Sequence, residues 1–138
     1  NNCLKYLKGK LYFERIDDDA AFVRSVDDVS IAVGHLSPIH DAHLVLPSKA
    51  VEGMARRKAV IHSMCEPIHT YYTKHGLSPA VCFYDNTVGG LAGVIADLHE
   101  NKSKMKIVGE NARKLVEQEH SHENVFHALN SALMNCIF

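Results

Sequence analysis

The residues whose types and spacing suit chemistry lie close together between Pro47 and Glu52. Pro47 and Ser48 are expected to open a helix, where proline fits because the first turn needs no N–H from it. The free amides of such a turn favour a phosphate or another anion, and Lys49 adds a cation beside them. Glu52 falls one turn further on the same face, where its carboxylate can accept two hydrogen bonds from a vicinal diol such as a ribose. A phosphate site beside a ribose site would make half of a nucleotide site.

The same positions also fit an ordinary capped helix. In that interpretation Lys49 and Glu52 are solvated and bind nothing. The spacing by itself leaves both interpretations open, and it assigns no catalytic residue.

Ten histidines and four cysteines are the other side chains that could hold a metal. His40 and His43 form one close pair and His120 and His122 another, but neither spacing matches a zinc signature such as His-Glu-x-x-His. We therefore expect no metal, and histidines that are solvated or hydrogen-bonded one by one. The cysteines form no Cys-x-x-Cys pair, which indicates reduced thiols in a cytoplasmic protein.

The pattern along the chain predicts the elements that must position these residues. Short apolar runs alternate with segments of helical periodicity, which is typical of an α/β protein with a mostly parallel sheet. Strands are expected at 11–13, 29–33, 59–61 and 80–84, with helices between and after them. We predict a partial doubly wound, Rossmann-like parallel sheet of about four strands, with helices on both faces and a helical C-terminal tail.

Several helix ends carry recognisable signals. The acids at 17–19 and Ser121 are expected at helix starts, and Gly76 at a helix end. The connection at 34–46 is long for one between a strand and a helix, and long loops there are often functional. Ligands of doubly wound sheets bind outside the carboxyl ends of the strands, so this loop and the helix after it are the expected binding region. The last three helices carry apolar stripes that include Leu91, Val94, Ile95 and Leu98, then Val108, Ala112, Leu115 and Val116, then Val125, Phe126, Leu129, Ala132 and Leu133.

Length and charge limit the classes of function. The chain has 138 residues, which we expect to form one domain, and its net charge at pH 7 is −1. That charge gives no basic field for nucleic acid. No apolar run approaches the roughly 18–20 residues of a membrane span, so we expect at most a peripheral membrane association. The chain begins without methionine or a signal-peptide layout, which leads us to expect a piece of a longer cytoplasmic protein.

The segment at 46–61 resembles the donor-site segment of the family four (group 1) glycosyltransferases. Members of that family often carry the run Leu-Pro-x-Lys-x-x-Glu-x-Met-Ala-x-Gly-x-Pro-Val-Ile. The segments at 27–29, 108–116 and 121–125 resemble three further pieces of the family, in the same order and at fitting spacing. The resemblance covers residues 11–133, which is nearly the whole chain.

This resemblance implies the C-terminal domain of a two-domain GT-B enzyme, the domain that binds the nucleotide sugar. Such an enzyme transfers a hexosyl group to a glycan or lipid acceptor with retention of configuration, and it needs no metal or other cofactor. The amides near Ser48 and Lys49 would face the diphosphate, and Glu52 would hold the ribose. The implied site residues are Pro47, Ser48, Lys49 and Glu52 for the donor nucleotide, and His35, Asp41 and His43 for the loop against the donor sugar.

The sequence departs from the family pattern at several positions. Leu44 stands where the first of two paired glutamates would fall. Arg57 replaces the glycine of the run, which requires a different turn or a strained left-handed backbone. Residues 64–67 replace a Gly-Gly pair beside the donor. The first βαβ unit of the domain and the N-terminal domain are not expected in this chain, so we expect no transferase turnover from it alone.

Two other classes of function stay open. A degenerate, non-catalytic α/β domain would act as an oligomerisation or protein-interaction module, because an incomplete sheet invites a second copy or another chain. A receiver-like domain would use Asp85 after the fourth strand, but no matching lysine at a strand end is evident. Replacing Glu52 with alanine distinguishes the donor site from the interaction module. The substitution should weaken nucleotide binding if the chain has a donor site, and it should change little if the chain is an interaction module.

Overall fold

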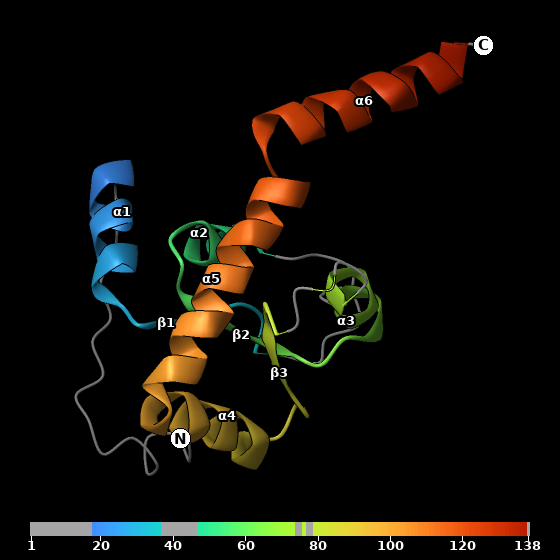
Figure 1. The fold of residues 1–138 in the computed structure, drawn as a ribbon. Helices are drawn as coiled ribbons and strands as arrows, with labels where there is room; N and C mark the ends of the chain where they lie inside the picture. The colour runs from blue at the N-terminus through green and yellow to red at the C-terminus, as the bar shows by residue number, and fades with distance from the viewer. Residues whose placement is uncertain (1–17, 37–46, 74–75, 77–78, 138) are drawn as a thin grey trace.

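The structure is a computed structural model that describes residues 18–36, 47–73, 76 and 79–137. These residues form six helices and three strands, and Figure 1 shows how they are arranged. In chain order the elements are α1 (Asp19–Asp28), β1 (Ile31–Val33), α2 (Ser48–Ala55), β2 (Ala59–Ser63), α3 (Glu66–Thr73), β3 (Cys82–Tyr84), α4 (Val88–Glu100), α5 (Lys102–Glu119) and α6 (His122–Ile137).

The three strands form one parallel sheet in the order β1-β2-β3. Ile31 pairs with Ala59, and Ile61 pairs with Cys82. The described sheet therefore has three strands instead of the four or so predicted, because the strand expected at 11–13 lies outside the described residues. β1 is also shorter than the run predicted at 29–33, since α1 extends to Asp28 and the chain needs two residues to turn into the strand.

Helices pack on both faces of the sheet, because alternate side chains of β2 point to opposite sides. Val60 joins a buried cluster with residues of α2, α3 and the second half of α5, among them Met54 and Leu115. Ile61 joins another cluster with residues of α4 and the first half of α5, among them Leu98. α5 therefore contributes to both clusters, and it crosses in front of the sheet in Figure 1.

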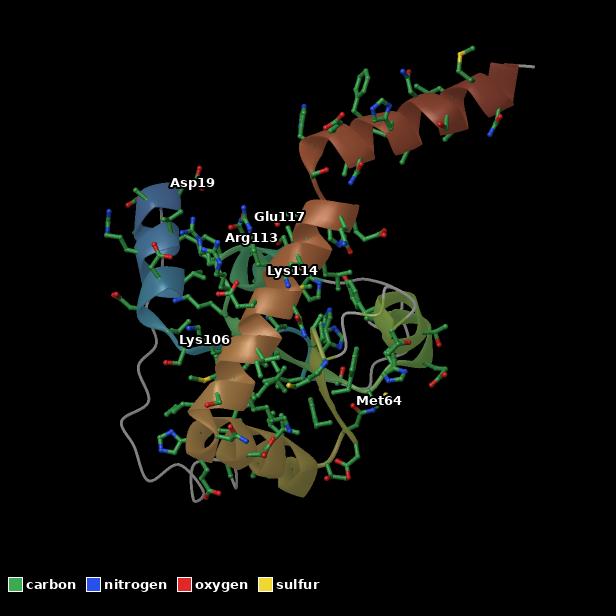
Figure 2. The ribbon with its side chains drawn as sticks, viewed as in Figure 1. Asp19, Met64, Lys106, Arg113, Lys114 and Glu117 are labelled. Carbon is green, nitrogen blue, oxygen red and sulfur yellow. The ribbon has the colours of Figure 1, made fainter. Side chains whose placement is uncertain are left out.

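α5 also packs closely on the turn that follows α2. An added Cβ at Gly109 would collide with the backbone carbonyl oxygen of Arg57. Nη1 of Arg113 (Figure 2) donates a hydrogen bond to the carbonyl oxygen of Ala55 at 2.6 Å. The apolar stripe predicted for this helix is confirmed as its buried face: Val108, Ala112, Leu115 and Val116 are all buried.

The helix ends carry the signals that the sequence predicted. A side-chain oxygen of Asp18 accepts a hydrogen bond from the backbone N of Ala21 at 2.6 Å and begins α1. Oγ of Ser121 accepts one from the backbone N of Asn124 at 3.2 Å and begins α6. Gly76, beyond the end of α3, has a φ of +66°, a conformation that glycine adopts without strain.

The turn between α2 and β2 holds Arg57 in the left-handed region, with a φ of +57°. The N–H of Lys58 donates to the carbonyl oxygen of Gly53 at 2.9 Å, and the N–H of Arg57 donates to that of Met54 at 3.0 Å. These two bonds define a Schellman helix end, where glycine is the usual residue. Of the two alternatives that the sequence raised for this position, the left-handed backbone is therefore the one observed.

Replacing Arg57 with glycine is expected to raise the free energy of unfolding by about 1 kcal/mol, because it removes the strain of a left-handed L residue. The change also removes the contact of 3.3 Å between Nε of Arg57 and Glu110, but both side chains are largely exposed and such pairs contribute little. Replacing Arg57 with alanine is the control, since it loses the same contact and keeps the strain. In urea unfolding, a glycine variant no more stable than the alanine variant would contradict this account of the turn.

α6 leaves the body of the fold and extends away from the sheet (Figure 1). An apolar stripe at helical spacing normally marks a buried face. Here the stripe is exposed because the helix does not fold back on the sheet, and the exposed fraction is between 43% and 59% for Val125, Phe126, Leu129 and Leu133. Within the described part of the chain, no helix combines the length and the apolar character needed to cross a membrane.

Candidate functional site

The carboxyl edge of the sheet is where α2, α3 and α4 begin, since each follows a parallel strand. Ser48 and Lys49 lie in the first turn of α2, and both are exposed. The carbonyl oxygen of Pro47 accepts hydrogen bonds from the backbone N of Ala50 at 2.8 Å and of Val51 at 3.3 Å, but its side chain provides no cap. The helix therefore presents the amides of Ser48 and Lys49 without a side-chain acceptor from the described residues.

The other described helices begin differently. Side-chain oxygens of Asp18, Thr87, Asn101 and Ser121 accept hydrogen bonds from first-turn amides of α1, α4, α5 and α6. α3 carries an acid, Glu66, in its first turn. Among the helices that the structure describes, α2 is thus the one whose positive end has neither a side-chain cap nor an acid, and an external anion can take that place.

Glu52 lies on the exposed face of α2, one turn after Ser48, so the positions that the sequence grouped together share one surface. Its Oε2 lies 3.9 Å from Nε of Arg56, whose Nη1 donates to Oδ1 of Asp27 at 2.9 Å. An ion pair of that length at a half-exposed position holds a carboxylate weakly. Glu52 can therefore still accept hydrogen bonds from a diol.

The imidazole of His62, near the carboxyl end of β2, is a second polar group at this edge. The residue has no exposed surface, and its Nδ1 lies 2.8 Å from the carbonyl oxygen of Ser63. A carbonyl oxygen can only accept, so Nδ1 carries the proton and Nε2 presents a lone pair. Nε2 is buried and has no hydrogen-bond partner within the part of the chain that the structure describes. The ring of His35 meets it edge to face, with 5.9 Å between the ring centroids.

Gly34 leaves room for this imidazole beside the first turn of α2. A Cβ at Gly34 would lie 2.7 Å from Cδ2 of His62 and 3.5 Å from the Cβ of Ala50. Cδ2 is therefore the atom of the imidazole ring that comes nearest to the position of a Cβ on Gly34. Gly34, His62 and Ala50 therefore pack closely together where the end of β1 meets the first turn of α2.

Burial is the main reason that the pKa of His62 lies below its ordinary value; the charge on His35 lowers it further, and the bond to Ser63 opposes the shift. Burial also lowers the pKa of His120. Unfolded histidine titrates near pH 6.5, so below about that pH the unfolded chain binds more protons than the folded one. We therefore expect the melting temperature to be highest above about pH 7 and to fall as the pH drops toward about 5.

Replacing His62 with glutamine removes one of these two groups and is expected to flatten the dependence of the melting temperature on pH. Replacing His127 with glutamine is the control, because this histidine is exposed on α6. Thermal unfolding of both variants at a series of pH values checks the expectation. A His62 variant whose curve runs parallel to that of the unchanged protein would show that the buried imidazole does not carry the effect.

Of the three residues predicted for the loop against the donor sugar, the structure describes one. His35 lies at the carboxyl edge beside His62, whereas Asp41 and His43 lie outside the described residues. His62 itself was missed by the sequence-based prediction. The signal that could have found it is a titratable residue inside a short apolar strand that ends at the binding edge. In the described ranges, no three or more His, Cys, Asp or Glu side chains gather where they could hold a metal ion.

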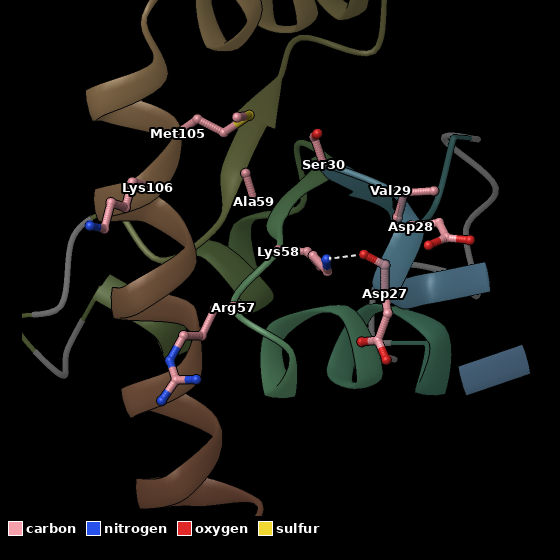
Figure 3. A pocket seen from close by; sticks show the side chains of 9 residues that line it. All are labelled: Asp27, Asp28, Val29, Ser30, Arg57, Lys58, Ala59, Met105 and Lys106. Carbon is pink, nitrogen blue, oxygen red and sulfur yellow. Dashed lines mark hydrogen bonds between the residues drawn. The ribbon is translucent and has the colours of Figure 1, made fainter. Parts of the chain in front are cut away.

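A pocket of about 310 Å³ opens at the opposite, amino edge of the sheet (Figure 3). Nζ of Lys58 donates to the backbone oxygen of Asp27 at 2.7 Å within it. Basic and acidic side chains both border this pocket, so its charge favours no single class of ligand. Its lining residues are Asp27, Asp28, Val29, Ser30, Arg57, Lys58, Ala59, Met105 and Lys106.

The carboxyl edge therefore combines a positive helix end, a nearby lysine and an exposed carboxylate, which are groups that suit a ligand with a phosphate and hydroxyls. The amino-edge pocket offers no such combination. Comparison of the chain with protein-family models, with curated proteins and with solved structures found no match.

Proposed function

We propose that the chain binds a nucleoside diphosphate sugar at the carboxyl edge of its sheet, as the donor-binding portion of a retaining glycosyltransferase. The amides of Ser48 and Lys49 face the diphosphate, and Glu52 holds the ribose. The sheet belongs to a doubly wound, Rossmann-like domain, and the acceptor site is supplied by a second domain. The helix end and Lys49 provide the positive charge that the diphosphate requires, without a metal.

The observation that carries this proposal is the start of α2. Ser48 and Lys49 of its first turn are exposed, the described residues provide no side-chain cap or acid there, and the turn lies where ligands of parallel α/β sheets bind. Lys49 in that turn adds a full positive charge. A diphosphate is a common biological anion that suits a helix end and a lysine together.

The resemblance to the glycosyltransferase run supports the same proposal, because its residues fall where their chemistry fits. Met54 is buried in the core, whereas Glu52 is exposed on the surface of α2. Arg57 occupies a left-handed position, and the run carries glycine there. The backbone of this turn therefore has the shape that the glycine of the run would favour.

Thermal unfolding of the chain with UDP, GDP, ADP or TDP tests the proposal. A ligand at about 100 times its dissociation constant adds roughly 2.7 kcal/mol to the free energy of unfolding, which is a rise of several degrees. We expect one nucleotide to raise the melting temperature, and the rise to be lost when Glu52 is replaced with alanine. Replacing Glu117 with alanine is the matched control, because Glu117 also pairs with an arginine four residues away.

The thermal unfolding of the unchanged chain and of the two variants distinguishes a donor site at α2 from its absence. A rise that the Glu52 variant loses and the Glu117 variant keeps supports a donor site at α2 and identifies the base. A chain that melts cooperatively but responds to none of the four nucleotides would contradict the proposal.

The second candidate function is an oligomerisation module, and the exposed stripe of α6 favours it. Val125, Leu129 and Ala132 follow at the i, i+4, i+7 spacing of helices that pair. Glu123 is the one Asp, Glu, Lys or Arg in the helix, so two copies can approach without strong repulsion. The partner proposed for this surface is therefore a second copy of the chain.

Sedimentation of the chain tests this second candidate. We expect a dimer that becomes a monomer when Leu129 is replaced with glutamate, because a charge on the stripe must then be buried. Replacing Asn130, an exposed polar neighbour, with glutamate is the control and is expected to leave the dimer intact. A monomeric unchanged protein, or equal effects of both variants, would exclude α6 as the pairing surface.

A further inference from the structure

We propose that two α6 dimers join through Phe126 and Leu133, so that four copies of the chain bring their α6 helices together in one bundle. This inference rests on the second candidate function and deepens it, because it states how many copies the α6 surface joins. The dimer expected above is then half of the assembly, and it forms a tetramer as the protein concentration rises.

The apolar face of α6 is wider than the seam at which two helices pair. Val125, Leu129 and Ala132 form that seam. Successive residues of an α-helix are turned by about 100°, so Phe126 lies beside the seam and not in it. Leu133 follows Phe126 after about two turns and lies on the same side, and we call these two residues the flank. Apolar residues beside the seam are typical of helices packed in a bundle, whereas a two-stranded coil carries the seam alone.

Pairing along the seam leaves the flank exposed. Phe126 is 57% and Leu133 is 59% exposed in the single chain, so each presents a large apolar side chain to water. No described residue of α6 belongs to either buried cluster, and α6 extends away from the body of the fold (Figure 1). Another helix can therefore reach the flank, and the burial of its apolar surface favours that contact.

α6 is short for a helix that pairs through a seam alone. It has 16 residues, which is about two heptads. Pairing through such a seam is typical of helices with about three to four heptads or more. A second pair packed against the flank supplies apolar contact that the short seam lacks. The length of α6 therefore favours four helices over two.

The symmetry of the pair explains why the second pair is another dimer of the same chain. α6 begins at the body of the fold, so antiparallel neighbours avoid crowding all the bodies at one end of the bundle (Figure 1). The two-fold axis of an antiparallel pair puts both flanks on the same side. One side of each dimer then presents the flank residues of both copies, and a second dimer carries the same surface. Glu123 is the one Asp, Glu, Lys or Arg of α6, so like charges oppose this contact only weakly.

Analytical ultracentrifugation of the unchanged chain over about a hundredfold range of concentration tests the inference. We expect the dimer to be converted to a tetramer, which doubles the sedimenting mass. Replacing Phe126 and Leu133 together with glutamine is expected to leave the dimer and abolish the tetramer, because burying unpaired amide groups is costly. Replacing His127 and Met134 together with glutamine is the matched control, since these exposed residues have the same spacing and lie about 100° further around the helix.

An unchanged protein that stops at a dimer would overturn the inference while the pairing through α6 stands. A tetramer that survives in the variant of the flank, or that is lost equally in the control variant, would overturn it in the same way. An unchanged protein that is a monomer at every concentration would overturn the second candidate function and this inference with it. The concentration series of the unchanged protein needs no substitution, so the test holds even if the variant of the flank fails to fold.

Discussion

Replacing Gly109 with alanine is expected to lower the free energy of unfolding by about 3 kcal/mol. The added Cβ would collide with the carbonyl oxygen of Arg57, which is backbone and cannot swing aside as a side chain can. α5 would have to move away from the turn, and with it the residues that α5 contributes to both buried clusters. The higher helix propensity of alanine offsets only about 1 kcal/mol of this cost.

Gly93 provides the matched control for this substitution. It also lies inside a helix, but beyond its chain neighbours and the backbone of its own helix, no described atom comes within 4 Å of the Cβ that an alanine would add. Replacing Gly93 with alanine is therefore expected to raise the free energy of unfolding by about 0.5–1 kcal/mol. Urea unfolding measures the free energy of unfolding of the Gly109 and Gly93 variants. Two variants that change stability in the same direction would contradict the close approach of α5 to the turn at Arg57.

Replacing Leu115 with alanine is the second large expected effect, a loss of about 2–5 kcal/mol. Leu115 has no exposed surface and lies in the cluster that joins α2, α3 and α5 on one face of β2. Removing its side chain leaves a cavity that the surrounding elements can fill only in part. Chemical unfolding with fluorescence or circular dichroism measures the loss.

Replacing Leu129 with alanine tests whether burial of the leucine side chain causes the loss of stability expected at Leu115. Leu129 is 59% exposed on α6 of the single chain, so in the monomer its replacement with alanine is expected to change the free energy of unfolding by less than about 0.5 kcal/mol. A loss at Leu129 comparable with that at Leu115 would show that α6 packs against something in solution. A second copy of the chain is the partner that the spacing of its stripe favours.

Much of the fold could be predicted from local signals. The apolar run at the start of β2 (Ala59–Ser63) predicts a strand buried on both faces, and all five residues of that strand are buried. The caps at Asp18 and Ser121 predict where α1 and α6 begin. What could not be predicted depends on tertiary contacts, because periodicity shows that a helix has an apolar face and not what covers that face. α6 is the example, since its stripe is regular and yet exposed.

The candidate site could be predicted in part for the same reason. Pro47 and Ser48 mark a helix start in the sequence, and the start of α2 lies at the carboxyl edge as expected. His62 could not be assigned, because the meaning of a single polar residue in an apolar strand depends on its neighbours across the sheet. Only the burial of the residue, and the carbonyl that fixes the proton on Nδ1, show that Nε2 is left unpaired among the described residues.

The most direct measurement of the central claim is an amide NMR titration of the chain with the nucleoside diphosphate that the thermal panel selects. The proposed site predicts that the largest shift changes occur at the amides of Ser48 and Lys49, with smaller changes at Gly34. Saturable changes confined to this edge of the sheet would support a diphosphate on the first turn of α2. Changes centred instead on Asp28 and Lys106 in the amino-edge pocket, or no changes at α2, would contradict it.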